Sequence, residues 1–436
     1  MAADAGADGR QEVSDTIYAL SSGSPPAAIA VVRISGPNAD RALEALAGAL
    51  PEPRRASVAE LRHEGELLDR ALVMRFPGPR SATGEDVAEL HLHGGRAVVA
   101  AVLGALSQVD GLRAAEPGEF TRRAFLNGRV DLAEAEGLAD LLAAETQAQR
   151  RAALALAGGA LSREIEAWQR RILVLAAELE AALDFADEQD VGEGLPSRWA
   201  ERTEAMAAEL GTVVRRPPVE RLRDGIRVAI TGPPNAGKSS LFNALVGRDA
   251  AITSKIPGTT RDLVEAPVLI EGTPFLLIDT AGIRESQDPI EAIGVERARS
   301  AMAAADLILW LGSPDRAPES ERALRIHPKS DIFRSAPESD VAVSALTGSG
   351  LDELTRVLLV RARHLLPRED EVAVNARHRV LLAECAARLQ EAARAEDLLI
   401  AAEALRQARI ALDRITGRAG VEDMLDALFG QFCIGK

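Results

Sequence analysis

The chain has 436 residues, more than one hydrophobic core usually organises, so its length predicts roughly two or three domains. Apolar residues make up 47% and charged residues 27% of the chain, as in ordinary globular proteins, whereas aromatic residues make up only 3%. Because alanine supplies much of the apolar fraction, this composition favours helix over sheet. The net charge of −15 excludes a protein that coats nucleic acid with its whole surface, although a local basic patch can still bind a phosphate backbone.

Several features predict a cytoplasmic protein without a membrane segment. The most apolar window, Ile172 to Leu183, is interrupted by Glu178 and Glu180 and is shorter than a membrane span. The first ten residues are polar and acidic and lack the apolar region of a signal peptide. The only two cysteines, Cys385 and Cys433, are too few for a disulfide framework or a cysteine zinc site.

The first predicted unit spans residues 1–116 and mixes strands with helix. Strand-like runs at 28–32 and 71–76 flank a helical stretch at 39–49, a pattern typical of a compact α+β domain. From Pro117 the sequence becomes rich in alanine and leucine at helical spacing as far as about Val214. Residues 117–223 are therefore predicted to form the first part of a helical domain.

A change of pattern near residue 224 predicts that a second type of domain is inserted into the helical one. Pro217-Pro218 and Gly225 end the helical spacing, and alternating strand and helix signals then run through 224–366. Beyond this segment, residues 367–436 return to helical periodicity, in stretches at 376–395, 397–416 and 421–429. The predicted fold class is thus multidomain, α/β plus all-α, with an α/β domain inserted into a helical one.

Residues 232–239 match the phosphate-binding pattern G-x-x-x-x-G-K-S and lie between a predicted strand at 227–231 and a predicted helix at 239–246. Glycines let backbone N–H groups turn toward phosphates, and the helix N-terminus favours anions. Lys238 is expected to reach the outer phosphates during catalysis, and Ser239 to bind Mg²⁺. The expected nucleotide contacts are Asn235, Ala236, Gly237, Lys238, Ser239 and Ser240.

Two later motifs fit the switch regions of a GTPase. Asp279-Thr280-Ala281-Gly282 follows an apolar strand, so Asp279 is expected near Mg²⁺ and the Gly282 N–H near the terminal phosphate. Between the two motifs, Thr259 and Thr260 stand in a G-T-T-R-D run, where the Thr260 hydroxyl is expected to complete the magnesium shell. Each short motif alone is more often a turn, but their order after a phosphate loop predicts a Ras-like GTPase.

The base-recognition motif is incomplete. The usual Asn-Lys-x-Asp stands here as Pro328, Lys329, Ser330 and Asp331, so the Asp331 carboxylate can still accept from guanine N–H groups but the asparagine amide is missing. Ser344 and Ala345, after a predicted strand at 341–343, are expected to complete the base site. The sequence thus predicts GTP as the nucleotide, bound by a weakened guanine site.

The predicted G domain also departs from the usual pattern in two further places. The segment from the predicted strand at 306–311 to Lys329 is short and contains Pro314 and Pro318, so one crossover helix is expected to be truncated or missing. Ile283 follows the Asp-Thr-Ala-Gly motif where Ras-like switches carry the glutamine that orients water. Another group must take that role.

Together the motifs resemble those of the MnmE (TrmE) family of tRNA-modification GTPases. The resemblance covers nearly the whole chain and rests on residues 232–239, 258–262, 279–285, 83–86, 89, 93–95 and 117–128 and on the C-terminal Cys433-Ile434-Gly435-Lys436. The family's G domain is inserted into its helical domain, behind a folate-binding α+β domain. The resemblance therefore implies the same arrangement here.

The resemblance also implies how GTP is hydrolysed. In the family, a glutamate of the second switch orients water through another water molecule, and the matching residue is Glu291. Potassium, held partly by a residue that matches Asn235, supplies positive charge at the phosphates and helps two G domains of a homodimer meet. By the residues alone, Glu291 is equally a solvated helix residue and Asn235 a turn former.

For the N-terminal domain, the resemblance implies dimerisation and a site for 5-formyltetrahydrofolate. The matching ligand positions are Arg33, Glu89, Arg129 and Lys436, with arginine at 129 where the family has lysine. An arginine alone at position 33 or 129 would more often be a surface ion pair. Cys433 is a candidate catalytic thiol, although tail packing or substrate positioning is the more ordinary role for such a residue.

The implied activity is modification of wobble uridine in certain tRNAs to its 5-(carboxymethyl)aminomethyl form, with an MnmG (GidA)-like flavoprotein as partner. The alternative is a ribosome-assembly or signalling GTPase with a helical docking scaffold; an ATP-dependent kinase fits the switch motifs less well. A cluster of arginines in the linker is either solvated surface or a local RNA contact. It comprises Arg215, Arg216, Arg221, Arg223 and Arg227.

Overall fold

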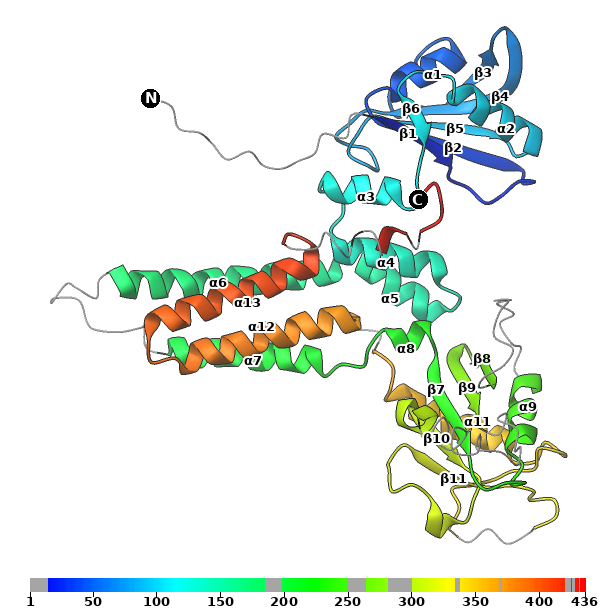
Figure 1. Ribbon diagram of the computed structural model, residues 1–436, viewed down its shortest axis with the longest axis vertical. Helices are drawn as coiled ribbons and strands as arrows, with labels where there is room; N and C mark the ends of the chain where they lie inside the picture. The colour runs from blue at the N-terminus through cyan, green and yellow to red at the C-terminus, as the bar shows by residue number, and fades with distance from the viewer. Residues whose placement is uncertain are drawn as a thin grey trace, which may run out of the picture. The chain divides into compact units, whose positions relative to one another are not determined.

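The computed structural model describes residues 15–184, 198–248, 264–280, 300–333, 338–368, 371–419, 425, 428–430 and 432–436. The chain divides into two compact units (Figure 1). The first unit comprises residues 1–139 and 413–436, and the second comprises 140–412. None of the helices within the described ranges is long and apolar enough to cross a membrane.

The first unit is built on a six-stranded sheet of order β3-β4-β5-β2-β1-β6. Its strands are β1 (Thr16–Leu20), β2 (Ile29–Ser35), β3 (Ser57–His63), β4 (Glu66–Phe76), β5 (Val87–His93) and β6 (Leu112–Ala114). Alternation along β2 buries Val32 and Ile34 while Arg33 is only half-buried, as expected for a strand with one covered face. Helices α1 (Ala39–Ala47) and α2 (Arg96–Leu106) share the core of that covered face.

Two helices and the C-terminal tail complete the first unit. Helices α3 (Glu119–Leu126) and α4 (Leu132–Ala143) follow the sheet, and Leu132 packs in one cluster with Phe429 and Phe432 of the tail. Pro117, just before α3, forms an isolated β-bridge with Ile434. The last residues of the chain therefore lie against the beginning of α3.

The second unit contains the helical domain. Its helices are α5 (Gln147–Ala157), α6 (Ala160–Asp184), α7 (Trp199–Val214), α12 (Ala376–Arg394) and α13 (Leu398–Thr416). Helices α7 and α12 pack side by side although the whole G domain separates them in sequence (Figure 1). The prediction of helices at 376–395 and 397–416 is confirmed, whereas most of the predicted helix at 421–429 lies outside the described residues.

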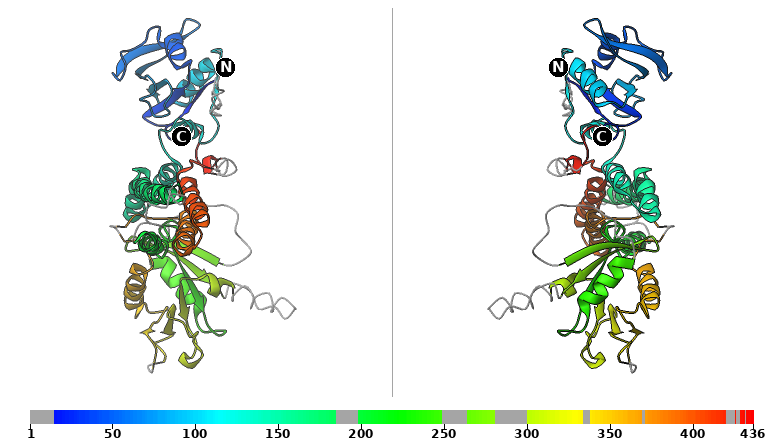
Figure 2. Two further views of the ribbon diagram at one scale, coloured as in Figure 1. Left: turned by 90° about the vertical axis from the view of Figure 1, so that its left-hand side faces the viewer. Right: turned by 90° about the vertical axis from the view of Figure 1, so that its right-hand side faces the viewer.

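The inserted α/β domain carries a second six-stranded sheet, of order β12-β11-β10-β7-β9-β8. Its strands are β7 (Ile226–Thr231), β8 (Val264–Ile270), β9 (Thr273–Asp279), β10 (Leu307–Trp310), β11 (Ala323–His327) and β12 (Val341–Ala342). The pair β8–β9 is antiparallel, and the other four neighbouring pairs are parallel. Val228 and Ile230 share a core with α9 (Lys238–Arg248) and α11 (Leu351–Arg363). Ala229 packs on the opposite face. Figure 2 shows the ribbon from two further sides.

The connection from β10 to β11 is short. Between these parallel neighbours, residues 311–322 hold only a 3₁₀ turn at Pro314–Arg316. The prediction of a missing crossover helix is confirmed, because Pro314 and Pro318 leave too little uninterrupted chain for an α-helix. The fold class predicted from sequence, a shortened G domain inserted into helices behind an α+β domain, is also confirmed.

Candidate functional site

The phosphate-loop segment joins β7 to α9 at the carboxyl edge of the central sheet. Its first glycine, Gly232, has φ +147°, and a Cβ there would come within 3.1 Å of the Leu311 main chain. Asn235 also adopts a positive φ, 62°. The loop therefore requires glycine at position 232, both for its backbone conformation and because Leu311, which follows the neighbouring strand of the sheet, comes so close.

Lys238, the first residue of α9, folds back over this loop. Its Nζ donates to the main-chain oxygens of Gly232 at 3.0 Å and Pro233 at 2.9 Å. Ser239 and Ser240 follow on the exposed first turn of the helix. The ammonium, the helix N-terminus and two hydroxyls thus lie together at the end of the loop, an arrangement suited to phosphates.

Asp279 lies at the same edge of the sheet. It ends β9, pairs in register with Ile230 of β7, and is only 3% exposed. The next residue, Thr280, donates from Oγ1 to the Ile230 carbonyl at 2.8 Å. Because the carboxyl ends of parallel strands meet at one edge, the Asp279 carboxyl group and the phosphate loop are neighbours.

The predicted base-recognition residues also come to this edge. Lys329 follows β11 with φ 56° and donates from Nζ to the Asn235 carbonyl at 2.9 Å. The Ser330 N–H donates to the Val343 carbonyl at 3.1 Å, which joins this turn to the segment bearing Ser344 and Ala345. Asp331 is exposed, whereas Ser344 is fully buried.

Four predicted nucleotide-site residues cannot be placed. Thr259, Thr260, Gly282 and Glu291 all lie outside the described residues. Among the residues that the structure describes, it brings together the phosphate loop, Lys238, Ser239, Asp279 and Lys329. The threonine and glutamate roles stay predictions.

A second candidate site lies in the first unit, on the sheet face opposite α1 and α2. Arg33 of β2 and Glu89 of β5 are cross-strand partners, with the Arg33 Nε 3.0 Å from the Glu89 Oε1. Their side chains are 25% and 16% exposed. The Arg33 guanidinium lies 5.8 Å from the Phe120 ring centroid, and the His91 Nε2 lies 3.5 Å from the other Glu89 oxygen.

Arg129 and Lys436 belong to the same unit. The Cγ of Arg129 lies 3.2 Å from the position a Cβ would take on Gly84, so this exposed arginine rests against the loop between β4 and β5. A Cβ on Gly435 would come within 2.2 Å of the Leu20 carbonyl at the end of β1. The structure thus joins Arg33 to Glu89, and it places Arg129 beside a loop and Gly435, the residue before Lys436, against the end of β1.

The two cysteines have different surroundings. Cys433, in the tail between Phe432 and Ile434, is exposed. Cys385 is buried in α12, and burial raises the pKa of its thiol to about 12, so this thiol stays protonated and unreactive. Of the two thiols, Cys433 is the one exposed to solvent.

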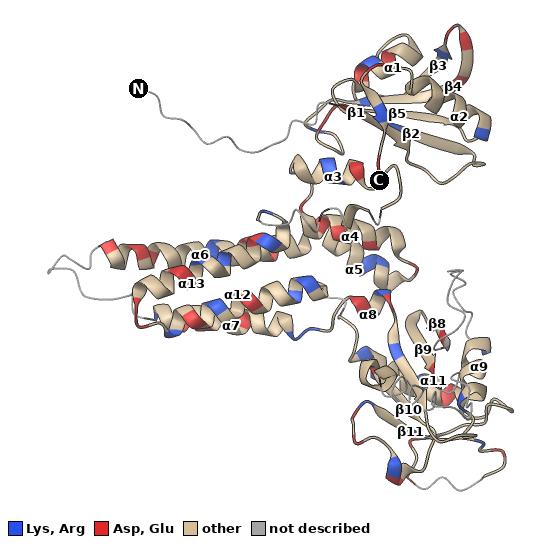
Figure 3. Ribbon diagram, in the orientation of Figure 1, with Lys and Arg blue, Asp and Glu red and all other residues tan. Residues whose placement is uncertain are grey.

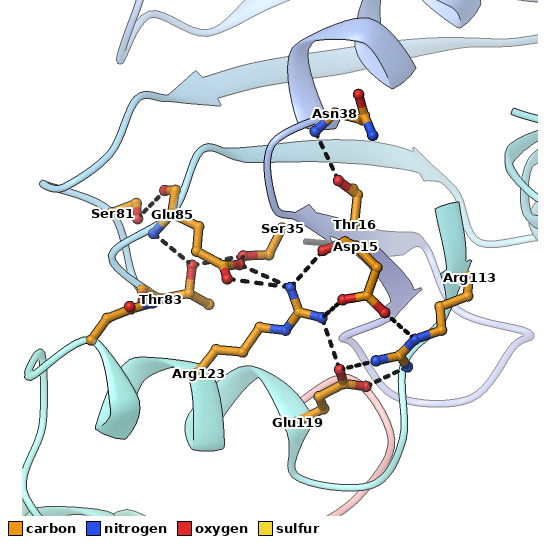
Figure 4. A network of polar contacts seen from close by, with 11 residues as sticks. Asp15, Thr16, Ser35, Asn38, Ser81, Thr83, Glu85, Arg113, Glu119 and Arg123 are labelled. Atoms are coloured by element: carbon orange, nitrogen blue, oxygen red, sulfur yellow. Dashed lines mark hydrogen bonds and ion pairs between the residues drawn. The ribbon is translucent and has the colours of Figure 1, made fainter. Parts of the chain in front are cut away.

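Arg123 is a residue of the first unit whose role no sequence pattern indicates. This α3 arginine is 2% exposed and bonds to carboxylates from three parts of the first unit, Asp15, Glu85 and Glu119 (Figure 4). The available signal was the Glu119 to Arg123 spacing of four residues in a helix, which is also the commonest spacing of an ordinary surface pair.

The arginine cluster of the linker makes protein contacts. Arg221 pairs with Asp306 at 2.7 Å, Arg223 bonds to Asp224 at 2.9 Å, and Arg216 donates to the Val372 carbonyl. Figure 3 shows Lys and Arg interspersed with Asp and Glu along the described helices. These contacts favour a structural role for the cluster over an RNA contact.

Comparison with known proteins gives the family. The family model "MnmE helical domain" matches residues 132–433, and the model "GTP-binding protein TrmE N-terminus" matches residues 16–129. A "tRNA modification GTPase MnmE" of Erythrobacter litoralis is 58% identical over 97% of this chain and 100% of its own length. Its namesake in Rhizorhabdus wittichii is 58% identical over 97% of both chains, and that of Novosphingobium aromaticivorans is 54% identical over 97% of this chain and 100% of its own. The predicted family is therefore confirmed, and the chain belongs to the MnmE family of tRNA modification GTPases.

Proposed function

We propose that the chain hydrolyses GTP at the carboxyl edge of its central parallel sheet. One observation carries this proposal: the phosphate loop, Asp279 and the base-recognition Lys329 converge on that edge. The predicted guanine ligands there are the Asp331 carboxylate and the Ser344–Ala345 segment. Replacing Lys238 with alanine should abolish GTP turnover, and turnover that persists in this variant would refute the assignment.

The same edge suits Mg²⁺. The Ser239 hydroxyl and the buried Asp279 carboxyl group offer the hard oxygen ligands that this ion prefers, and Thr260 is the proposed third ligand. Magnesium, when bound, neutralises charge on the phosphates. Burial of Asp279 keeps its carboxyl group fixed at the end of β9, where Ile230 and Thr280 hold the neighbouring backbone.

We further propose that hydrolysis depends on K⁺, Glu291 and a second copy of the chain. Asn235 is exposed at the tip of the phosphate loop, so its side-chain oxygen is accessible to an ion. Potassium supplies positive charge in place of an arginine. The Glu291 carboxylate is the proposed water-orienting group, because Ile283 stands where other switches have glutamine.

The second site is proposed to bind 5-formyltetrahydrofolate. The Arg33 side chain is 25% exposed, and its guanidinium can pair with a carboxylate of the folate glutamate. Glu89, its partner at 3.0 Å, can accept from pterin N–H groups. Arg129 and Lys436 are the proposed further cations, and the exposed Cys433 near Lys436 is the candidate thiol.

Membership of the MnmE family supports tRNA modification as the function. We propose that the chain acts in the cytoplasm as a homodimer, and that with a flavoprotein like MnmG (GidA) it installs the 5-(carboxymethyl)aminomethyl group on wobble uridine. The test is reconstitution with this flavoprotein, the folate donor, glycine or ammonium, GTP and unmodified tRNA in potassium. Persistently unmodified tRNA would contradict the proposal, and failure to bind the folate would favour a plain switch GTPase.

A further inference from the structure

Arg123 is a buried cation in the middle of a network of polar contacts in the first unit (Figure 4). Its guanidinium donates to the Asp15 main-chain oxygen at 2.9 Å and to the Asp15 carboxylate at 2.8 Å. It also lies 2.9 Å from the Glu119 Oε1, and 3.2 Å and 3.3 Å from the two oxygens of Glu85. A buried charge is tolerated only with such partners, so Arg123 holds the beginning of β1 and the loop between β4 and β5 onto α3.

The Glu85 carboxylate also connects Arg123 to the end of β2. Its Oε2 accepts from the Ser35 Oγ at 2.7 Å, and Ser35 is in turn 2.7 Å from the Thr83 Oγ1. Because a serine hydroxyl has one hydrogen and Ser35 gives it to Glu85, the Thr83 hydroxyl must donate to Ser35. Ser35 stands two residues after Arg33 and therefore on the same face of the sheet.

The same loop reaches Arg129 on its other side. The Thr83 carbonyl accepts from the Asn127 Nδ2 at 2.8 Å. At Gly84, where φ is +84°, a Cβ would come within 2.8 Å of the Asn127 Cβ and 3.2 Å of the Arg129 Cγ. The loop is thus packed directly on the stem of Arg129, so a displaced loop would release that side chain.

Helix α3 also supports Arg33. Phe120, one helical turn before Arg123, lies under the Arg33 guanidinium, and it is itself buried. We propose that Arg123 is a positioning residue for the folate site: through Glu85, Ser35 and the loop at 81–86 it fixes Arg129 relative to Arg33. This inference rests on the proposed folate-binding function.

The competing explanation is that Arg123 only stabilises the fold, and the network contains a matched control. Arg113 shares two partners with Arg123, because it also donates to Asp15 and Glu119. The Arg113 side chain is 44% exposed. The Glu85 carboxylate, in contrast, is bonded by the guanidinium of Arg123. Loss of Arg113 therefore weakens the ion cluster without releasing the loop.

The test is calorimetric binding of 5-formyltetrahydrofolate to the full chain, with the thermal midpoint of each variant measured alongside. Arg123→Lys and Ser35→Ala should each raise the Kd about tenfold, the effect of losing one buried charge-assisted contact. Arg113→Lys should leave the Kd within about twofold of the unmodified chain, as expected for a half-exposed position. Ser35→Ala removes only a hydroxyl, so it still tests the positioning role if Arg123→Lys does not fold.

The outcomes separate this inference from the function on which it rests. If Arg33→Ala weakens folate binding while Ser35→Ala and every folded Arg123 variant bind like the unmodified chain, the positioning role is refuted and the folate site stands. If Arg113→Lys weakens binding as much as Arg123→Lys, the effect is general destabilisation and the positioning role is again refuted. If the unmodified chain does not bind the folate, both proposals fail.

Discussion

Lys329 donates a hydrogen bond from its ammonium to the main-chain oxygen of Asn235, at 2.9 Å, across 94 positions of sequence. The residue that is expected to cover the base therefore also holds the tip of the phosphate loop. This contact joins base recognition to the phosphate site.

The first prediction separates these two roles. Lys329→Ala should weaken GDP and ADP binding alike, by about tenfold, because it releases the loop that contacts the phosphates of both. Asp331→Ala should weaken GDP alone, because its carboxylate recognises guanine. Titrations with fluorescent GDP and ADP measure the affinity of the two variants for each nucleotide. If Lys329→Ala weakened the binding of GDP alone, the lysine would act only on the base.

A second prediction concerns the backbone of the phosphate loop. Gly232→Ala should destabilise the chain by about 1–3 kcal/mol, because φ +147° and the Leu311 main chain at 3.1 Å both oppose a side chain. Nucleotide binding should fall with it. Chemical denaturation measures the first effect, and Gly247→Ala in α9 is the control.

Gly247 has open space around a Cβ and an ordinary helical φ. Alanine there should stabilise the chain, by up to about 1 kcal/mol. Equal effects of the two substitutions would contradict the strain assigned to Gly232.

The third prediction follows from the carboxylates around Arg123. Burial raises the pKa of Glu119, but hydrogen bonds from Arg113, the Glu116 N–H and Arg123 outweigh it, so the folded-state pKa lies below the ordinary 4.5. A lowered pKa means that the folded state binds the proton less readily than the unfolded state. The stabilisation is therefore complete above pH 4.5 and is lost as the pH falls below that value.

Urea unfolding at several pH values between 7 and 3 tests this prediction. Glu119→Gln should lower the free energy of unfolding at pH 7 and reduce its loss on acidification. Glu66→Gln, at an exposed position of β4, should leave both unchanged. An unaltered acid dependence in Glu119→Gln would contradict the assignment.

The fourth prediction concerns the tail. Cys433→Ser should lower reconstituted tRNA modification by about tenfold or more, because the exposed thiol is the proposed reacting group. Cys385→Ala should retain modification, because that thiol is buried in α12. GTP turnover reports whether each variant is folded, and full modification by Cys433→Ser would remove the thiol from the chemistry.

The parts that were predictable from sequence are those set by local patterns. The strand before Gly232, the helix after it and the missing crossover helix near Pro314 follow from short runs of residues whose geometry is dictated locally. In the first sheet, the strand-like runs at 28–32 and 71–76 were predictable, and they lie in β2 and β4. Family motifs then supplied Arg33 and Glu89, which the structure pairs across two strands.

The network of Arg123 was not predictable in this way. Asp15 and Glu85 lie 108 and 38 positions from it in sequence, and no local rule relates them. Their meeting depends on how the loop between β4 and β5 packs on α3. The Lys329 contact with Asn235 has the same origin, because tertiary packing brings two loops to one edge of a sheet.

The central proposal is that GTP hydrolysis by this chain uses potassium and Glu291. GTP turnover by the purified chain should be at least about tenfold faster in potassium than in sodium at equal ionic strength, and Glu291→Ala should remove that turnover while retaining GTP binding. Equal rates in the two salts, or full activity of Glu291→Ala, would contradict the account.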